Sequence, residues 1–143
     1  MIKYSGITIG LLWVIMTAGN VSADPMKFTD IFNAGHEKMT WLETISWGFD
    51  IKKDGFDPVS MEVLKASIEL AVEDDNNDIQ ILPNEFALLV IEDSQSFLWE
   101  VDTDDYTFGI SSLLTLNKDG TISASLTSLL GDFYFNTATL TAF

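Results

Sequence analysis

The ten residues from Leu64 to Glu73, LKASIELAVE, alternate between apolar and polar side chains almost without a break. Because successive side chains of an extended chain point to opposite faces, this repeat of two predicts a β-strand that is buried on one face. A helix over residues 59–70 is the alternative, since Met61, Glu62 and Lys65 favour helices. The regular alternation in the second half of the stretch favours the strand.

Similar segments lie on both sides of this run. Upstream, residues 39–51 alternate, with Glu43 as the only charged residue on an otherwise apolar face. Downstream, short runs rich in apolar and β-branched residues occupy positions 86–91, 97–101, 106–116, 121–129 and 132–143. Turn-forming residues separate these runs, and Lys118-Asp-Gly120 is typical of a hairpin turn.

This pattern predicts an all-β fold, an antiparallel two-sheet sandwich or jelly-roll-like arrangement of about seven to nine strands. The sequence lacks the alternation of strands and helices that would indicate a parallel sheet. It also lacks an internal repeat or a linker that would divide the chain. We therefore assign residues 39–143 to a single β-sandwich domain. Residues 24–38 precede it as a polar lead-in without a sustained period.

Residues 1–23 have the parts of a secretory signal peptide. Lys3 stands near the start, the apolar stretch Ile7–Met16 follows, and Val21 and Ala23 occupy the small-residue positions before a cleavage site. A retained membrane anchor is the alternative, but the apolar stretch is shorter than the roughly 20 residues of a spanning helix. We expect cleavage before Asp24 and a secreted, extracellular protein without a membrane partner.

The balance of charge is strongly acidic. The chain has 22 acidic residues and a net charge of −15, which becomes −16 once Lys3 is removed with the signal peptide. Such a field repels phosphate backbones and anionic lipids, so nucleic acids and membranes are excluded as partners and cations are favoured. The chain has no cysteine, so disulfides cannot stabilise it outside the cell and a bound ion is a natural substitute.

The loop Asp74-Asp-Asn-Asn-Asp78 is the best candidate for a cation site, because calcium prefers carboxylate, amide and backbone oxygens. With Asp74 as position one, Asn76, Asp78 and Glu85 fall at positions three, five and twelve, which is the ligand spacing of an EF-hand. Ile79 stands where that loop needs glycine, and the flanks predict strands instead of helices. We therefore interpret the segment as a calcium loop of a sandwich, with a solvated turn as the alternative.

Three stretches together resemble small extracellular domains of environmental bacteria, found in proteins with exosortase-type (PEP-CTERM-like) sorting signals. They are 46–51 with 54–58, 66–70 with 73–75, and 131–135 with 138–141. The chain has Phe49 before Asp50 where members commonly carry histidine, and it shows no sorting helix or basic tail. The resemblance implies an extracellular β-sandwich and supplies no catalytic residue.

The predicted metal ligands are Asp74, Asp75 and Asp78, with Asp50, Asp54 or Asp132 completing the set if the fold brings them together. Asp50, the Asp74/Asp75 pair and Asp132 lie within the resembling stretches, which supports this choice. A second acidic cluster, Asp102, Asp104 and Asp105, is the weaker candidate, because charges on a sheet edge also discourage strand addition.

Enzymatic activity is not expected. His36 is the only histidine and no cysteine is present, which leaves neither a nucleophilic triad nor a zinc site. Nothing in the sequence selects a pair of carboxylates for glycoside hydrolysis.

The sequence therefore predicts a secreted calcium-binding β-sandwich with a structural or adhesive role. One alternative is a carbohydrate-binding module, which requires at least two exposed, coplanar Trp or Tyr side chains on one face. The other is the subunit of an extracellular fibre that self-associates by strand exchange, with residues 24–38 as the donor segment.

Overall fold

The computed structural model describes residues 24–75, 85–92 and 95–143, and these form eight strands and two short helices. The strands are β1 (Phe28–Met39), β2 (Thr44–Asp50), β3 (Ala66–Asp74), β4 (Phe86–Ile91), β5 (Gln95–Glu100), β6 (Asp104–Gly109), β7 (Thr121–Leu130) and β8 (Phe133–Ala142). The 3-10 helix η1 (Ile51–Asp54) follows β2, and the α-helix α1 (Leu114–Asp119) precedes β7.

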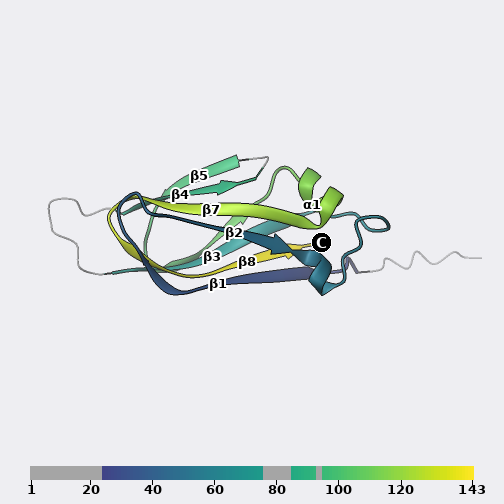
Figure 1. Cartoon of the computed structure of the whole chain (residues 1–143), viewed down its shortest axis with the longest axis horizontal. Coiled ribbons are helices and arrows are strands. Elements are labelled where there is room, and N and C mark those ends of the chain that lie inside the picture. The colour runs from purple at the N-terminus through teal and green to yellow at the C-terminus, as the bar shows by residue number, and fades with distance from the viewer. Residues whose placement is uncertain (1–23, 76–84, 93–94) are drawn as a thin grey trace, which may run out of the picture.

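The strands form two four-stranded antiparallel sheets that pack face to face (Figure 1). Sheet A has the strand order β1-β8-β3-β6, and sheet B has the order β2-β7-β4-β5. This arrangement confirms the predicted all-β two-sheet sandwich. The strand predicted from LKASIELAVE is β3, and its alternate residues from Ala66 to Val72 are buried as the pattern requires.

The core lies between the sheets and consists of the inward residues of both. Alternation supplies these residues on every central strand, because each second side chain faces the opposite sheet. The largest fully buried side chains of the strands are Phe49, Phe133, Phe135, Met39, Ile68, Leu70, Leu89, Ile91, Ile122 and Leu126.

The segment assigned to a lead-in forms most of β1, so the sandwich begins at Phe28 and not at Met39. This strand pairs with β8 along almost its whole length, from Phe28 opposite Ala142 to Met39 opposite Phe133. A bulge interrupts the register between Asn33 and Glu37. The bulge breaks the alternation of side chains, which explains why the sequence pattern did not indicate a strand here.

The turn between β1 and β2 also differs from the prediction of one continuous strand over 39–51. The side chain of Glu43 accepts hydrogen bonds from the backbone N–H and the hydroxyl of Thr40, at 2.9 and 3.0 Å. Leu42 adopts a left-handed φ of 62°. Glu43 is therefore the residue that closes this turn, and it does not lie on the apolar face of a strand.

The strand predicted over 106–116 ends at Gly109, and a helix begins within that range, at Leu114. β6 ends at Gly109, and α1 ends at Gly120, whose φ is 69° and whose N–H donates to the carbonyl of Leu116 at 2.8 Å. Lys118-Asp-Gly120 thus ends a helix instead of forming a hairpin turn. The side chain of Asn117 bonds both backbone groups of the buried Val63, which fixes α1 at this end of the sandwich.

Candidate metal centre

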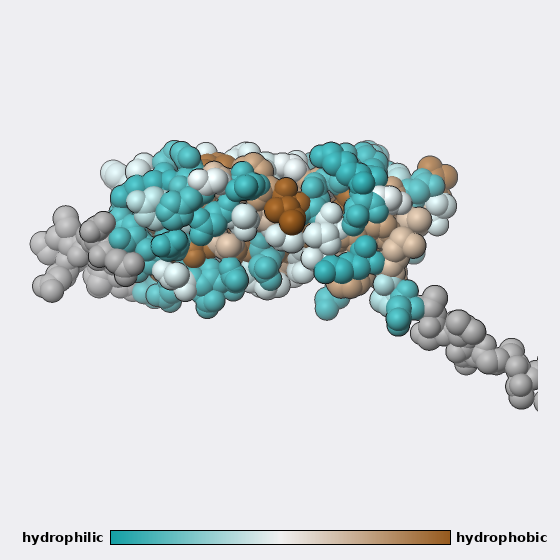
Figure 2. Space-filling model, turned by 90° about the horizontal axis from the view of Figure 1, so that it is seen from below, coloured by the Kyte–Doolittle hydropathy of each residue, from teal (hydrophilic) through white to brown (hydrophobic). Residues whose placement is uncertain are grey.

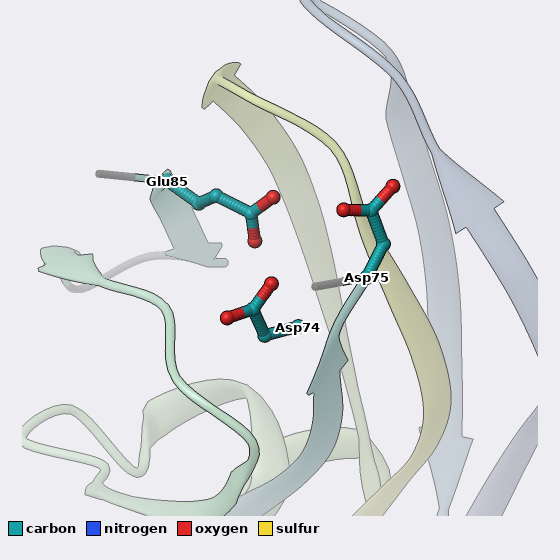
Figure 3. Close-up of side chains that lie close together, drawn as sticks. All are labelled: Asp74, Asp75 and Glu85. Atoms are coloured by element: carbon teal, nitrogen blue, oxygen red, sulfur yellow. The ribbon is translucent and has the colours of Figure 1, made fainter. Parts of the chain in front are cut away.

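Three carboxylates lie together where β3 ends and β4 begins. Asp74 ends β3, Asp75 follows it, and Glu85 immediately precedes β4. One oxygen of each side chain lies within 4.8 Å of the others, and Figure 3 shows Asp74 and Glu85 facing each other with Asp75 beside them. Since β3 belongs to sheet A and β4 to sheet B, the cluster spans the two sheets.

Glu85 is the deeply buried member of the cluster, with 2% of its surface exposed. The backbone N–H of Asp132 donates to its Oε1 at 3.3 Å. Gly131 packs so closely against it that a Cβ at position 131 would lie 2.7 Å from the Cγ of Glu85. Buried carboxylates in proteins are hydrogen-bonded, paired or bound to a metal, and here the β7–β8 turn holds the carboxylate in place.

Lys38 of β1 lies beside the cluster. Its Nζ is 3.0 Å from Asp75 and 2.5 Å from Asp132. Hydrogen bonds to Asp132 and then to Asp75 raise the pKa of Lys38 well above its ordinary value, so the ammonium form persists at every physiological pH. One ammonium group therefore faces the carboxylates of Asp75 and Asp132, with those of Asp74 and Glu85 close by.

The spacing of the three oxygens fits a single hard cation. Calcium binds oxygen ligands at 2.3–2.6 Å, so two oxygens that share the ion lie at most about 5 Å apart. Asp74, Asp75 and Glu85 meet this limit. Calcium takes six to eight oxygens, so three carboxylates would supply part of the shell and leave positions for backbone oxygens and water.

The fold brings only some of the predicted ligands together. Asp74 and Asp75 are in the cluster, and Asp132 lies next to it through Lys38 and through its backbone contact with Glu85. Asp78 lies outside the described residues.

Asp50 and Asp54 lie at the other end of the sandwich. Asp54 accepts a hydrogen bond from the N–H of Thr29 near the start of β1, and the N–H of Asp50 donates to Asp30. The cluster lies near Met39 at the opposite end of β1, which at about 3.3 Å per residue is roughly 30 Å away. These two residues therefore cannot complete the site.

Glu85 is the member of the cluster that the list of predicted ligands omitted, although a signal for it was present. It stands at position twelve when Asp74 is counted as the first, and position twelve is the bidentate glutamate of an EF-hand. The strands on both sides confirm that the loop is not an EF-hand. Nevertheless, positions one and twelve come together here, because β3 of sheet A ends at the same end of the sandwich where β4 of sheet B begins.

The weaker acidic cluster does not form one group. Asp104 and Asp105 lie on the edge strand β6 and line an open hollow with Glu73 and Asn136. Asp102 lies apart, and its N–H donates to the hydroxyl of Tyr106. Burial and the nearby carboxylates raise the pKa of Tyr106.

Among the residues that the structure describes, the aromatic side chains do not form the platform that carbohydrate stacking requires. Trp47 is buried in the core, and Trp99 packs against Tyr106 and Phe108 between the two sheets. Within the described ranges, Trp41 is the only tryptophan that is largely exposed, at 69%. Tyr134 is covered by His36, whose ring stacks on it at 4.2 Å. The carbohydrate-binding alternative therefore gains no support.

No protein-family model, curated protein or solved structure matches this chain. The resemblance to the exosortase-associated group stays a prediction, and function is inferred from the geometry of this chain alone. Neither of the helices in the described ranges is long and apolar enough to cross a membrane.

Proposed function

We propose that this protein is an extracellular β-sandwich that binds a divalent cation, calcium, between Asp74, Asp75 and Glu85, and that it has a structural or adhesive role. The observation that carries the proposal is the convergence of these three carboxylates, one of them buried, from both ends of the β3–β4 connection.

A cation at this place would act as a link between the sheets. Asp74 and Asp75 extend from sheet A, whereas Glu85 enters sheet B. The chain has no cysteine, so no disulfide performs this task. A disulfide acts mainly by restricting the unfolded chain. An ion that holds both ends of the connection would act differently, because it would bind the native state and stabilise it by mass action.

The electrostatics of the site favour a divalent ion. Like charges at this spacing repel each other, and the repulsion grows where water is excluded. The ammonium group of Lys38 offsets part of this repulsion through its ion pairs with Asp75 and Asp132. Because calcium sites of extracellular modules bind in the range of about 10⁻⁴ to 10⁻³ M, a partly neutralised, incomplete carboxylate shell suits the calcium concentration outside cells.

Thermal unfolding of the mature protein, residues 24–143, in calcium and in EDTA tests the proposal. An ion bound only to the native state at a hundredfold excess over its dissociation constant stabilises by about 2.7 kcal/mol. For a domain of this size the midpoint should rise by about 10 °C. Magnesium should have a smaller effect, because it demands shorter and more regular coordination.

Variants at the cluster separate a specific site from general screening. Asp74→Asn and Glu85→Gln should each remove most of the calcium effect. Asp54→Asn is the matched control, since Asp54 lies at the opposite end of the sandwich, and it should keep the full effect. Equal unfolding midpoints of the wild type in calcium and in EDTA would contradict the calcium proposal.

Export is tested separately. Protein recovered from the medium or periplasm should have the mass of a chain that begins at Asp24. Recovery of the intact 143-residue chain in the membrane fraction would contradict the extracellular role. The cation site would still be tested by thermal unfolding in calcium and EDTA.

A further inference from the structure

The candidate metal centre already holds a positive charge of the protein itself. The Nζ of Lys38 lies 3.0 Å from an oxygen of Asp75 and 2.5 Å from an oxygen of Asp132. The side chain of Asp75 is 2% exposed, whereas that of Asp132 is 39% exposed. The ammonium group therefore joins a buried carboxylate of the cluster to a carboxylate on the solvent side of the cluster.

The strand order of sheet A explains how Lys38 reaches Asp75. Lys38 of β1 and Glu73 of β3 are both paired with Tyr134 of β8, which lies between the two strands. The side chain of Lys38 crosses over β8, with its Nζ 5.8 Å from the centroid of the Tyr134 ring. Asp75 directly follows β3, and the ammonium group meets it there. A long side chain thus carries the charge, and only its end has to move for the charge to leave Asp75.

Calcium and this ammonium group compete for the carboxylate of Asp75. Oxygens of Asp74, Asp75 and Glu85 lie within 4.8 Å of one another, so an ion that they share is in direct contact with Asp75. An ammonium group on the same carboxylate would face the divalent ion at short range. Their repulsion is strong where water is excluded, and the Asp75 side chain is buried. Binding of calcium therefore favours loss of the contact between Lys38 and Asp75.

Asp132 offers a place for the displaced ammonium group. Its carboxylate already contacts the Nζ of Lys38, and its backbone N–H donates to Oε1 of Glu85, which keeps it beside the cluster. A rotation near the end of the Lys38 side chain can therefore release Asp75 and keep the ion pair with Asp132. On the face that Figure 2 shows, hydrophilic residues prevail at this end of the sandwich, on the left, which suits a solvated ammonium group.

We infer that Lys38 is an internal competitor of calcium, whose ammonium group binds Asp75 in the ion-free protein and is displaced from it when calcium binds. The inference rests on the calcium proposal above and adds a regulator to the same site. Before the protein meets calcium, Lys38 offsets the buried charge of Asp75. Displacement of the ammonium group opposes binding, so it raises the calcium concentration at which the site fills.

Isothermal titration of calcium into the mature protein, residues 24–143, tests the inference. Lys38→Met removes the ammonium group and keeps a long side chain, so it should bind calcium about tenfold more tightly than the wild type, or more. Lys38→Arg keeps the positive charge and should bind no more tightly than the wild type. Circular dichroism in EDTA confirms that each variant is folded.

Lys52→Met is the matched control. Lys52 is exposed to nearly the same extent as Lys38, and its Nζ lies 3.7 Å from Asp50 at the other end of the sandwich. The control removes the same charge far from the cluster, so any gain in its calcium affinity measures the general effect of one lost charge. Because salt screens charges that are far apart, this gain should be less than about twofold at physiological ionic strength.

Chemical labelling of the wild type gives a second readout that needs no variant at the cluster. An amine-reactive acetylating reagent is applied in calcium and in EDTA, and mass spectrometry measures the modification of each lysine. Calcium should increase the labelling of Lys38 severalfold and leave that of Lys52 unchanged. Equal labelling of Lys38 in both conditions, in a protein that binds calcium, would overturn the inference.

The titrations also distinguish failure of this inference from failure of the calcium proposal. If Lys38→Met binds calcium no more tightly than Lys52→Met, the competitor role of Lys38 is wrong and the calcium site stands. Weaker binding by Lys38→Met has the same meaning, because Lys38 would then position Asp75 for the ion. If neither the wild type nor any variant binds calcium, the calcium proposal is wrong and the inference falls with it.

Discussion

At the scale of single residues, Gly131 shows how a turn defines the candidate site. Its φ of 74° belongs to the left-handed region, and the space beside it is filled by Glu85. Glycine is needed here for two independent reasons, the backbone conformation and the close approach of a side chain.

Gly131→Ala should therefore lower stability more than an ordinary left-handed glycine does. Gly35 is the control, since its φ is 76° and nothing lies within 4 Å of a Cβ placed there. We expect Gly35→Ala to cost about 1–2 kcal/mol from backbone strain alone. Gly131→Ala should cost more and also weaken calcium binding, because Glu85 must move. Urea unfolding and calcium titration measure the two effects, and equal losses for both variants would contradict this reasoning.

Glu43 offers a prediction about pH. The backbone N–H of Thr40, and secondarily its hydroxyl, lower the pKa of Glu43 below 4.5. A carboxylate whose folded pKa is lowered stabilises the protein above its unfolded pKa, and the contribution is lost as pH falls through the folded value. Glu43→Gln should thus be less stable than the wild type at neutral pH, and the difference should vanish in acid.

Glu69→Gln, at an exposed position in the middle of β3, is the control for this measurement. Chemical denaturation at several pH values between about 2 and 7 gives both curves. A Glu43→Gln deficit that persists unchanged at the lowest pH would show that the turn does not depend on the ionised side chain.

At the scale of elements, β1 is an integral edge strand of sheet A. It pairs with β8 over nine residue pairs, and its Phe28 and Met39 are buried in the core. A truncated variant that begins at Met39 should lose its cooperative melt and aggregate, whereas a variant that begins at Lys27 should fold. Circular dichroism and size-exclusion chromatography distinguish the two outcomes.

The same truncation tests the fibre alternative. If strand exchange operates, a peptide of residues 24–38 added to the truncated variant should restore its cooperative melt, because it would supply β1 in trans. A truncated variant that is monomeric and cooperative by itself would show that β1 adds little to the sandwich.

Regular elements were predictable where one simple period governs them. β3 follows its alternation, and the short apolar run of β4 is a buried strand as expected. β1 was missed because a bulge with Gly35 and His36 at positive φ breaks its period. α1 was missed because six residues are too few for a helical period to stand out.

At the scale of the whole molecule, the candidate site was predictable only in part. The acidic run that ends β3 marks Asp74 and Asp75 in the sequence itself. The exclusion of Asp50 and Asp54, and the contact of Asp132 with Lys38, depend on which strand ends meet. Strand order and register decide this, and neither is encoded in the local pattern of a single segment.

Net charge gives the last prediction. With a net charge of −15 the protein repels itself, and the repulsion destabilises the compact state at low ionic strength. In EDTA, raising NaCl from about 10 mM to 1 M shortens the Debye length from about 30 to 3 Å, so the melting midpoint should rise. The ion pairs of Lys38 with Asp75 and Asp132 work in the opposite direction, because salt weakens them.

The variant Lys38→Met separates these two contributions. Without the ammonium group, Asp75 and Asp132 lose their screening partner, so the variant should gain more from salt than the wild type does. It should also gain more from calcium, since the ion would then be the only cation in the cluster. A midpoint that falls with salt in the wild type would mean that local ion pairs, and not the overall repulsion of 22 acidic residues, dominate the electrostatics of this fold.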